Sequence, residues 1–234
     1  MTPEALARVM EATWPPAQVA RLGPWTIRDG AGGGKRVSAA TADGAWTADD
    51  IAFAEAAMVA QVGPVLFLIR EGEAALDAAL ASRGYAFVDP VVAYACPAAS
   101  LPPPPGMTTF AHWPPLAIAR DLWTEGGIGP ARLAVMDRVA GPKTAILSRH
   151  SDRPAGVAFV AICGDTAMLH ALDVTPALRR RGSAHHILQA AALWAQDHGA
   201  GALALVVTAA NEPARALYAS LGMQRVGHYH YRQQ

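Results

Sequence analysis

The sequence predicts a mixed α/β (α+β) fold in which two successive units each alternate strands with helices. Three observations predict it. Runs of β-branched and apolar residues alternate with alanine-rich segments of helical periodicity along the chain. Four consecutive prolines, at positions 102–105, interrupt this alternation near its middle. Hydrophobic residues make up 52% of the 234 residues, which is enough to bury a sizeable core.

The first unit, residues 1–100, is expected to contain strands and helices in alternation. Strands at 25–28 and 36–39 flank a glycine-rich turn at 30–34. The pattern then predicts a helix at 49–61, a buried strand at 65–70, a helix at 73–83 that Gly84 ends, and a strand at 87–95.

The segment 101–106 separates the two units. Its prolines cannot continue a helix or a central strand, and they favour an extended, semi-rigid spacer. We therefore expect a linker at 101–106 between a first domain at 1–100 and a second at 107–234.

The second unit begins with two helices, at 116–123 and 130–139. It continues with a hairpin of strands 144–149 and 154–162, a strand at 167–174, a helix at 182–198, a buried strand at 203–208, a helix at 213–220 and a final strand at 225–231. The helix at 182–198 places its apolar residues at the i, i+3, i+4 and i+7 positions. That spacing is typical of a helix that packs on a sheet.

The two units also resemble each other weakly at an offset of 138 residues. The segment Ala81-Ser82-x-Gly84 matches Ala219-Ser220-x-Gly222, and the strand at 65–70 falls on the strand at 203–208. A shared order of elements together with these matches indicates a duplicated unit. Chance matches in an alanine-rich chain are the alternative.

Charge and cysteine content exclude several classes of partner. The formal net charge is zero, so the chain has no global field to attract nucleic acid or an anionic membrane. The two cysteines, Cys96 and Cys163, are far apart in sequence, which argues against a disulfide framework or a zinc site. No segment resembles a signal peptide or is long enough to span a bilayer. We expect a cytoplasmic protein with no metal, nucleic-acid or membrane partner.

A basic turn between the strand at 167–174 and the helix at 182–198 is the most informative segment. Arg179, Arg180 and Arg181 immediately precede Gly182, where the helix opens. Cations at a helix N-terminus oppose the helix dipole, whereas the free N–H groups there bind anions. The turn therefore predicts a site for a phosphorylated ligand, and a solvated basic helix start is the alternative.

Two motifs lie on these predicted elements. Val174-x-Pro176 ends a strand, and Arg179-x-x-Gly182-x-Ala184 opens the helix. A second pattern, N-x-x-A-x-x-L-Y-x-x-x-G, follows with Met in the place of a final aromatic residue, at Asn211, Ala214, Leu217, Tyr218, Gly222 and Met223. In this order the motifs resemble those of the GNAT superfamily, the acetyl-CoA-dependent N-acetyltransferases.

The resemblance implies a mixed, V-splayed central sheet flanked by helices, with two tandem GNAT-like domains of which the first is degenerate. It also implies acetyl-CoA as the acyl donor, held at 13 positions: Leu172, Asp173, Val174, Arg179, Arg180, Arg181, Gly182, Ser183, Ala184, Asn211, Ala214, Leu217 and Tyr218. In this interpretation the amides from Arg180 to Ala184 hold the pyrophosphate, and the main chain from Leu172 to Val174 pairs with the pantetheine arm.

The resemblance assigns Tyr218 as the acid that protonates the departing thiolate. Many family members carry a glutamate base six residues before the V of V-x-P, where this chain has Met168. His170 shares that strand face and could replace the base, or it could be a core histidine with satisfied hydrogen bonds. Glu125 is the other candidate, and a solvated loop carboxylate is its alternative interpretation.

The first unit lacks the acid and the basic turn, because Leu80 replaces Tyr218 and Thr41 replaces Arg179 at the offset of 138. We expect it to pack beside the second unit and to shape the entrance for the substrate. The predicted function is acetyl transfer from acetyl-CoA to a primary amine of a small molecule or peptide. The alternative is an acyl-CoA-binding sensor or assembly module without turnover. The amine stays open, as does the choice between monomer and homodimer.

Overall fold

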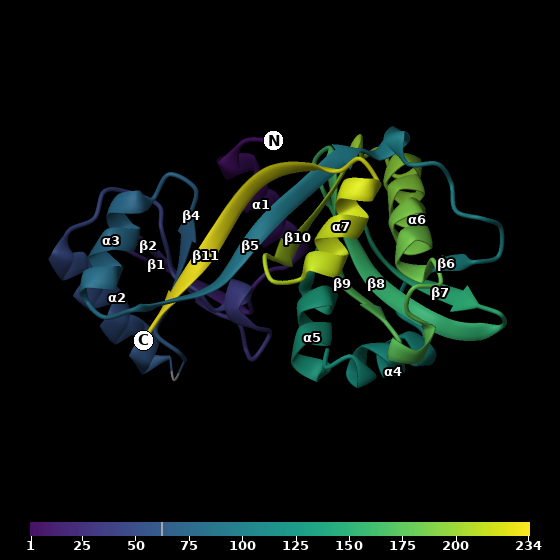
Figure 1. Cartoon of the computed structure of the whole chain (residues 1–234). Helices are drawn as coiled ribbons and strands as arrows, with labels where there is room; N and C mark the ends of the chain where they lie inside the picture. Colours follow the sequence, from purple (N-terminus) through teal and green to yellow (C-terminus); the bar gives the residue numbers. More distant parts are fainter. Residues whose placement is uncertain (62) are drawn as a thin grey trace.

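The computed structural model describes residues 1–61 and 63–234, which contain helices on both faces of a large sheet (Figure 1). The strands are β1 (Gln18–Leu22), β2 (Trp25–Asp29), β3 (Thr41–Ala42), β4 (Leu66–Arg70), β5 (Ala86–Pro97), β6 (Thr109–His112), β7 (Lys143–His150), β8 (Arg153–Cys163), β9 (Thr166–Val174), β10 (Ala202–Thr208) and β11 (Gln224–Gln233). The helices are α1 (Pro3–Thr13), α2 (Ala48–Ala60), α3 (Ala74–Ser82), α4 (Ala117–Glu125), α5 (Pro130–Arg138), α6 (Ser183–Asp197) and α7 (Glu212–Ser220).

The large sheet has the strand order β4-β11-β5-β10-β9-β8-β7-β6, and β1, β2 and β3 form a small antiparallel sheet. Within the large sheet β9 and β10 run parallel, and the remaining neighbours are antiparallel. The predicted mixed α/β fold is confirmed. Helix α6 connects the two parallel strands, as such a crossover requires.

The structure confirms the internal duplication. A shift of 138 residues places α3 on α7 residue for residue and brings the start of β5 onto the start of β11. The order β3-α2-β4-α3-β5 therefore recurs as β9-α6-β10-α7-β11.

The two repeats exchange their final strands. Strand β5 ends the first repeat but pairs with β10 of the second, whereas β11 ends the second and pairs with β4 of the first. The two exchanged strands also pair with each other and run side by side between the α2–α3 and α6–α7 regions (Figure 1). One hydrogen-bonded sheet thus extends across the proposed linker at 101–106.

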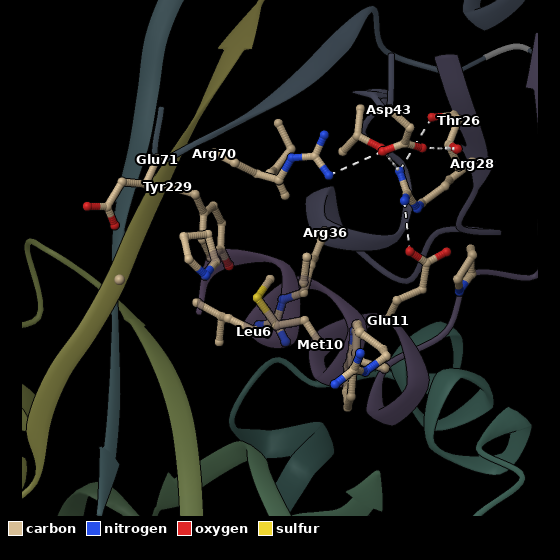
Figure 2. A pocket seen from close by; sticks show the side chains of 18 of the residues that line it. Leu6, Met10, Glu11, Thr26, Arg28, Arg36, Asp43, Arg70, Glu71 and Tyr229 are labelled. Carbon is tan, nitrogen blue, oxygen red and sulfur yellow. Dashed lines mark hydrogen bonds and ion pairs between the residues drawn. The ribbon is translucent and has the colours of Figure 1, made fainter. Parts of the chain in front are cut away.

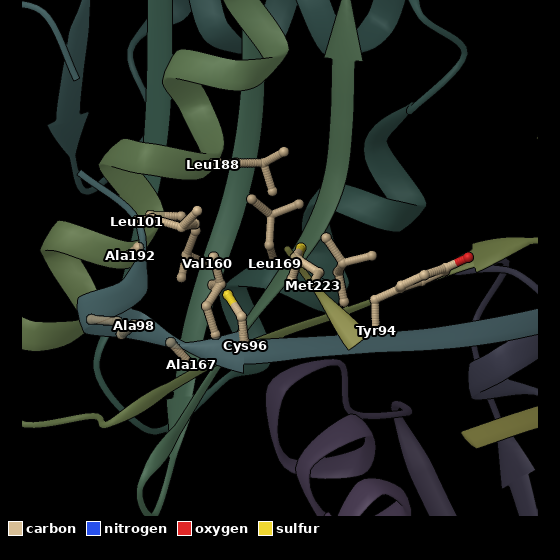
Figure 3. Close-up of a cluster of buried hydrophobic side chains, with 14 of the residues drawn as sticks. Tyr94, Cys96, Ala98, Leu101, Val160, Ala167, Leu169, Leu188, Ala192 and Met223 are labelled. Carbon is tan, nitrogen blue, oxygen red and sulfur yellow. The ribbon is translucent and has the colours of Figure 1, made fainter. Parts of the chain in front are cut away.

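Helices α6 and α7 cover one face of the second repeat. Ile187, Leu188 and Ala191 of α6 are fully buried against strands β5, β8, β9 and β10 (Figure 3). The opposite face carries α4 and α5, whose cluster also includes Trp14, the residue that follows α1. The first half thus contributes to the core of the second.

Several local predictions needed correction or addition. The predicted strand at 36–39 is wrong: residues Lys35–Val37 form a 3-10 turn, in which Ser38 Oγ donates to the Gly34 carbonyl at 3.1 Å. The structure adds α1, β1, β3 and β6, which the sequence analysis did not identify. Glu125, assigned to a loop, is the last residue of α4. Within the described residues, no helix has both the length and the apolarity that crossing a membrane requires.

Candidate functional site

Helix α6 begins with an open N-terminus. Gly182 is its N-cap in the left-handed conformation (φ 88°), and no side chain caps the helix there. The first intrahelical hydrogen bond runs from the His186 N–H to the Gly182 carbonyl at 2.9 Å. The amides of residues 183–185 therefore precede the helical bonding pattern and point out of the helix start. This end of α6 has the geometry of an anion site.

Ser183 adds a polar group to the same helix start. Ser183 is 3% exposed, and its Oγ has no hydrogen-bond partner among the described residues. An unpartnered buried hydroxyl costs about 1–3 kcal/mol. An oxygen of a bound anion would satisfy it, so the residues present at this turn fit a phosphorylated ligand.

The three arginines of the basic turn differ in their surroundings. Arg179 folds back on the strand end, since its Nε donates to the Val174 carbonyl at 2.9 Å and its Nη2 lies 3.9 Å from Asp173 Oδ1. Arg180 and Arg181 are exposed and form no ion pair with other described residues. Two of the three predicted guanidinium groups are thus free to meet an anion.

The two parallel strands separate beside this turn. Their pairing covers only residues 166–169 of β9 and 202–205 of β10, and both strands continue beyond it. A bulge at Ala171 (φ 51°) shifts the register of β9 against β8 at this point, and Trp123 Nε1 donates to the Ala171 carbonyl at 2.8 Å. The separation leaves backbone groups of 170–174 without a strand partner on the β10 side. This arrangement includes Leu172, Asp173 and Val174, the predicted pantetheine contacts.

Tyr218 lies on α7, on the α6 face of the sheet. It is 5% exposed, and its ring centre is 5.7 Å from that of Tyr94. Burial, with a smaller contribution from Tyr94, raises the pKa of Tyr218 to about 12. The phenol is therefore protonated at neutral pH and can donate a proton.

The rest of the second motif builds α7. Asn211 is exposed and is the N-cap of this helix, where its Oδ1 accepts the Ala214 N–H at 3.2 Å. Ala214 and Leu217 are half-buried and pack against the core that contains Tyr218. The motif thus fixes the start of the helix that positions Tyr218.

His170 is buried on the opposite face, against α1. Its Nδ1 lies 3.0 Å from Arg36 Nη1, and its Nε2 lies 2.8 Å from Thr13 Oγ1. A guanidinium can only donate, so Nδ1 accepts and Nε2 carries the proton of a neutral ring. Burial, with help from the Arg36 charge, holds the pKa of His170 well below its usual value. Both ring nitrogens are occupied, which favours the interpretation of a satisfied core histidine over that of a base.

A cavity of about 420 Å³ opens where β9 and β10 separate, on the face opposite α6; we call it the splay cavity. His170 lines it, whereas Glu125 and Tyr218 do not. Its walls also contain residues that the sequence analysis did not assign to a site: Trp14, Lys35, Arg36, Asp89, Arg132, Tyr229 and Tyr231. They come from both repeats, and no local motif marks them.

The first repeat has a counterpart, the N-terminal cavity of about 240 Å³ between α1, β2, β3 and β4 (Figure 2). Beside it, Ala40, the residue before β3, forms a single parallel bridge with Phe67 of β4. Its carboxylates each have a partner: Glu11 binds Arg28 at 2.9 Å, Asp43 binds Arg70 at 3.2 Å, and Glu71 lies 3.5 Å from His228 Nδ1. Arg36 lines both cavities.

Comparisons with known proteins agree with this geometry. The model of the Acetyltransferase (GNAT) family matches residues 117–223. The sequence matches no curated protein. A GCN5-related N-acetyltransferase from Kribbella flavida is similar in structure, with a TM-score of 0.76, 17% identity, and coverage of 99% of this chain and 95% of that one.

Two further solved structures have a similar fold. A conserved protein of unknown function from Staphylococcus epidermidis has a TM-score of 0.69 at 10% identity, with 97% of this chain and 98% of that one covered. A tandem GNAT protein from the clavulanic acid biosynthesis pathway has a TM-score of 0.65 at 15% identity, with 94% and 84% covered. At these identities the likeness shows the fold. Together with the family match, it shows that residues 117–223 form an acetyltransferase (GNAT) family domain within a GNAT fold.

Proposed function

We propose that this protein is an N-acetyltransferase that moves the acetyl group of acetyl-CoA to a primary amine. The observation that carries the proposal is the uncapped start of α6, with the buried and unpartnered Ser183 hydroxyl, beside the separated strands β9 and β10. A phosphorylated donor with an extended arm would satisfy both features at once.

The residues divide the binding of the donor between them. The amides of 183–185 and the side chains of Arg180 and Arg181 would hold its diphosphate. The unpaired edge of β9 at 170–174 would hydrogen-bond the pantetheine arm, as a further strand would. When bound, acetyl-CoA supplies a thioester carbonyl carbon for attack and a thiolate as the leaving group.

The amine lone pair forms the new C–N bond while the C–S bond breaks. The nitrogen loses one proton, and the thiolate gains one. Tyr218 is the donor of the second proton in this proposal, because its raised pKa keeps the phenol protonated. The α7 N-cap at Asn211 holds the helix that carries it.

Deprotonating the amine is the harder task. An alkylamine with a pKa near 10.4 costs about 4 kcal/mol to make neutral at pH 7.4. Asp89 is the only carboxylate among the described residues that line the splay cavity. Lys35 already forms an ion pair with it at 2.5 Å. The guanidinium groups of Arg36 and Arg132 would lower the pKa of an amine placed beside them. We propose that this environment, rather than His170 or Glu125, favours the neutral amine.

The second candidate is an acyl-CoA sensor without turnover. Met168 favours it, because this buried residue stands where many family members carry a glutamate, and His170 is held by Arg36 and Thr13. In that case the donor would bind but no acceptor would react.

A thiol-release assay with acetyl-CoA and a panel of primary amines separates the two candidates. Amine-dependent release of CoA, together with an acetylated product seen by mass spectrometry, would support the transferase. Tight binding of CoA with no amine acetylated would support the sensor, and failure to bind CoA would remove both.

A further inference from the structure

The splay cavity has an unusual balance of charge. Lys35, Arg36 and Arg132 supply three cations against the single carboxylate of Asp89, counted over the described residues that line it. The Lys35–Asp89 ion pair at 2.5 Å cancels one cation. Arg36 and Arg132 keep their charges, since neither forms an ion pair with a described carboxylate.

The two guanidinium groups come from different parts of the chain. Arg36 reaches the cavity from the first repeat. Its Nη1 donates a hydrogen bond to His170 Nδ1 at 3.0 Å, and its Cζ lies 6.0 Å from the centre of the Trp14 ring. Arg132 stands on α5 beside Gly34, and its Nε and Nη2 lie 3.7 Å from where a Cβ on Gly34 would stand. The fold therefore fixes one arginine in the wall and places an exposed one at the rim.

The remaining wall is aromatic and apolar. Tyr229 and Tyr231 of β11 are each 4% exposed and pack edge to face, with ring centres 5.6 Å apart. Val206 and Ile128 lie on the same cavity. A volume of about 420 Å³ lies within the range of roughly 300–1,000 Å³ that small-molecule sites occupy.

These observations select among amines. A polyamine or a cationic side chain would bring more positive charge to two unneutralised guanidinium groups, which is unfavourable. An amine that also carries an anion would bind them through charge-assisted, bidentate hydrogen bonds. We infer that the acyl acceptor is a small amine bearing an anionic group, as an amino acid does, and that Arg132 and Arg36 bind this anion. The inference rests on the proposed acetyl transfer.

Matched amine pairs test it, because each pair differs by one anionic group. The pairs are phenylalanine and phenethylamine, lysine and cadaverine, and O-phosphoethanolamine and ethanolamine. We expect the anionic member of a pair to have a kcat/KM about tenfold higher or more. Preference in the amino-acid pairs identifies a carboxylate, and preference only in the last pair identifies a phosphate.

Two substitutions test whether Arg132 and Arg36 cause the preference for the anionic amine. Arg132→Gln should bring the ratio within each pair toward one, mainly by raising KM for the anionic member. Arg36→Gln should act in the same direction, and its circular dichroism spectrum checks the fold. Arg120→Gln is the control, because Arg120 is an exposed helical arginine that does not line the cavity. Arg132 is exposed as well, so its variant is expected to fold.

Binding is measured separately, by calorimetry of phenylalanine and phenethylamine on the CoA-loaded protein. Transfer without preference for the anionic member, or an unchanged preference in Arg132→Gln, would overturn the inference and leave the transferase intact. Arginine-dependent binding of phenylalanine without transfer would support the anion site and overturn the transferase.

Discussion

Tyr218 is where a single atom has the most direct effect on the proposed chemistry. Replacing it with Phe removes the hydroxyl while keeping the buried ring against Tyr94. We expect the acetyl-transfer rate to fall about 10- to 100-fold, because the thiolate then leaves without its proton donor. Single-turnover kinetics measure the rate, and calorimetry should give an unchanged CoA affinity. An unaltered rate would make Tyr218 a structural residue.

The burial of His170 makes the free energy of unfolding depend on pH. Its pKa is depressed in the folded protein, so the unfolded chain takes up a proton near pH 6.5 while the folded chain does not. The unfolded state then binds more protons, and the free energy of unfolding falls as pH drops below about 6.5, by up to about 1.4 kcal/mol per pH unit.

The variant His170→Gln should flatten this dependence. Glutamine can still accept from Arg36 and donate to Thr13 but does not titrate. Urea denaturation at pH 7.5, 6 and 5 measures the slope for the wild type, for this variant and for His198→Gln, which replaces an exposed histidine. Equal slopes in the wild type and His170→Gln would contradict the assignment of a neutral, buried His170.

Among the secondary-structure elements, the start of α6 carries the proposed donor site. Arg180 and Arg181 are exposed and without ion pairs among the described residues, so changing both to Glu should spare the fold and repel a diphosphate. CoA at 100 times its Kd should stabilise the wild type by about 2.7 kcal/mol, which a melting experiment detects. We expect the double variant to lose this shift and Arg120→Glu to keep it. A full shift in the double variant would remove the anion site.

Periodic and motif-bearing elements could be predicted from sequence. The apolar stripe of α6 and the conflict between three arginines and a helix dipole are local signals, and the structure places them as expected. Helix α1 also has helix-start signals in its sequence, although no helix is predicted there: Thr2 is its N-cap and Pro3 lies in its first turn. Its buried face includes Leu6 and Met10. Residues 36–39 alternate like a strand, but the bond from Ser38 to Gly34 closes a turn instead.

At the scale of the whole molecule, the exchanged strands make the two repeats one folding unit. Leu80 is fully buried in the core of the first repeat, so Leu80→Ala should cost about 2–5 kcal/mol. Because β5 and β11 pair across both repeats, we expect one unfolding transition, with amides of β4 and β10 losing protection together in hydrogen exchange. Leu193→Ala, at a 40% exposed position, is the control. Two separate transitions would contradict this view.

The exchange and the splay cavity could not be derived from the sequence. The apolar pattern of β5 fits a partner in either repeat, so nothing local selects β10. Arg36, Arg132 and Tyr231 meet in one cavity although they are about a hundred residues apart along the chain. Only the tertiary fold brings them together, and this is why the sequence indicates the proposed donor turn but not the proposed acceptor side.

A crystal structure of the protein with CoA is the sharpest test of the proposed donor site at the start of α6. We expect the diphosphate on the amides of residues 183–185, the pantetheine arm along residues 170–174 of β9, and the sulfur within reach of the Tyr218 hydroxyl and facing the splay cavity. A CoA molecule bound elsewhere, with β9 and β10 closed and the Ser183 hydroxyl still unpartnered, would contradict it.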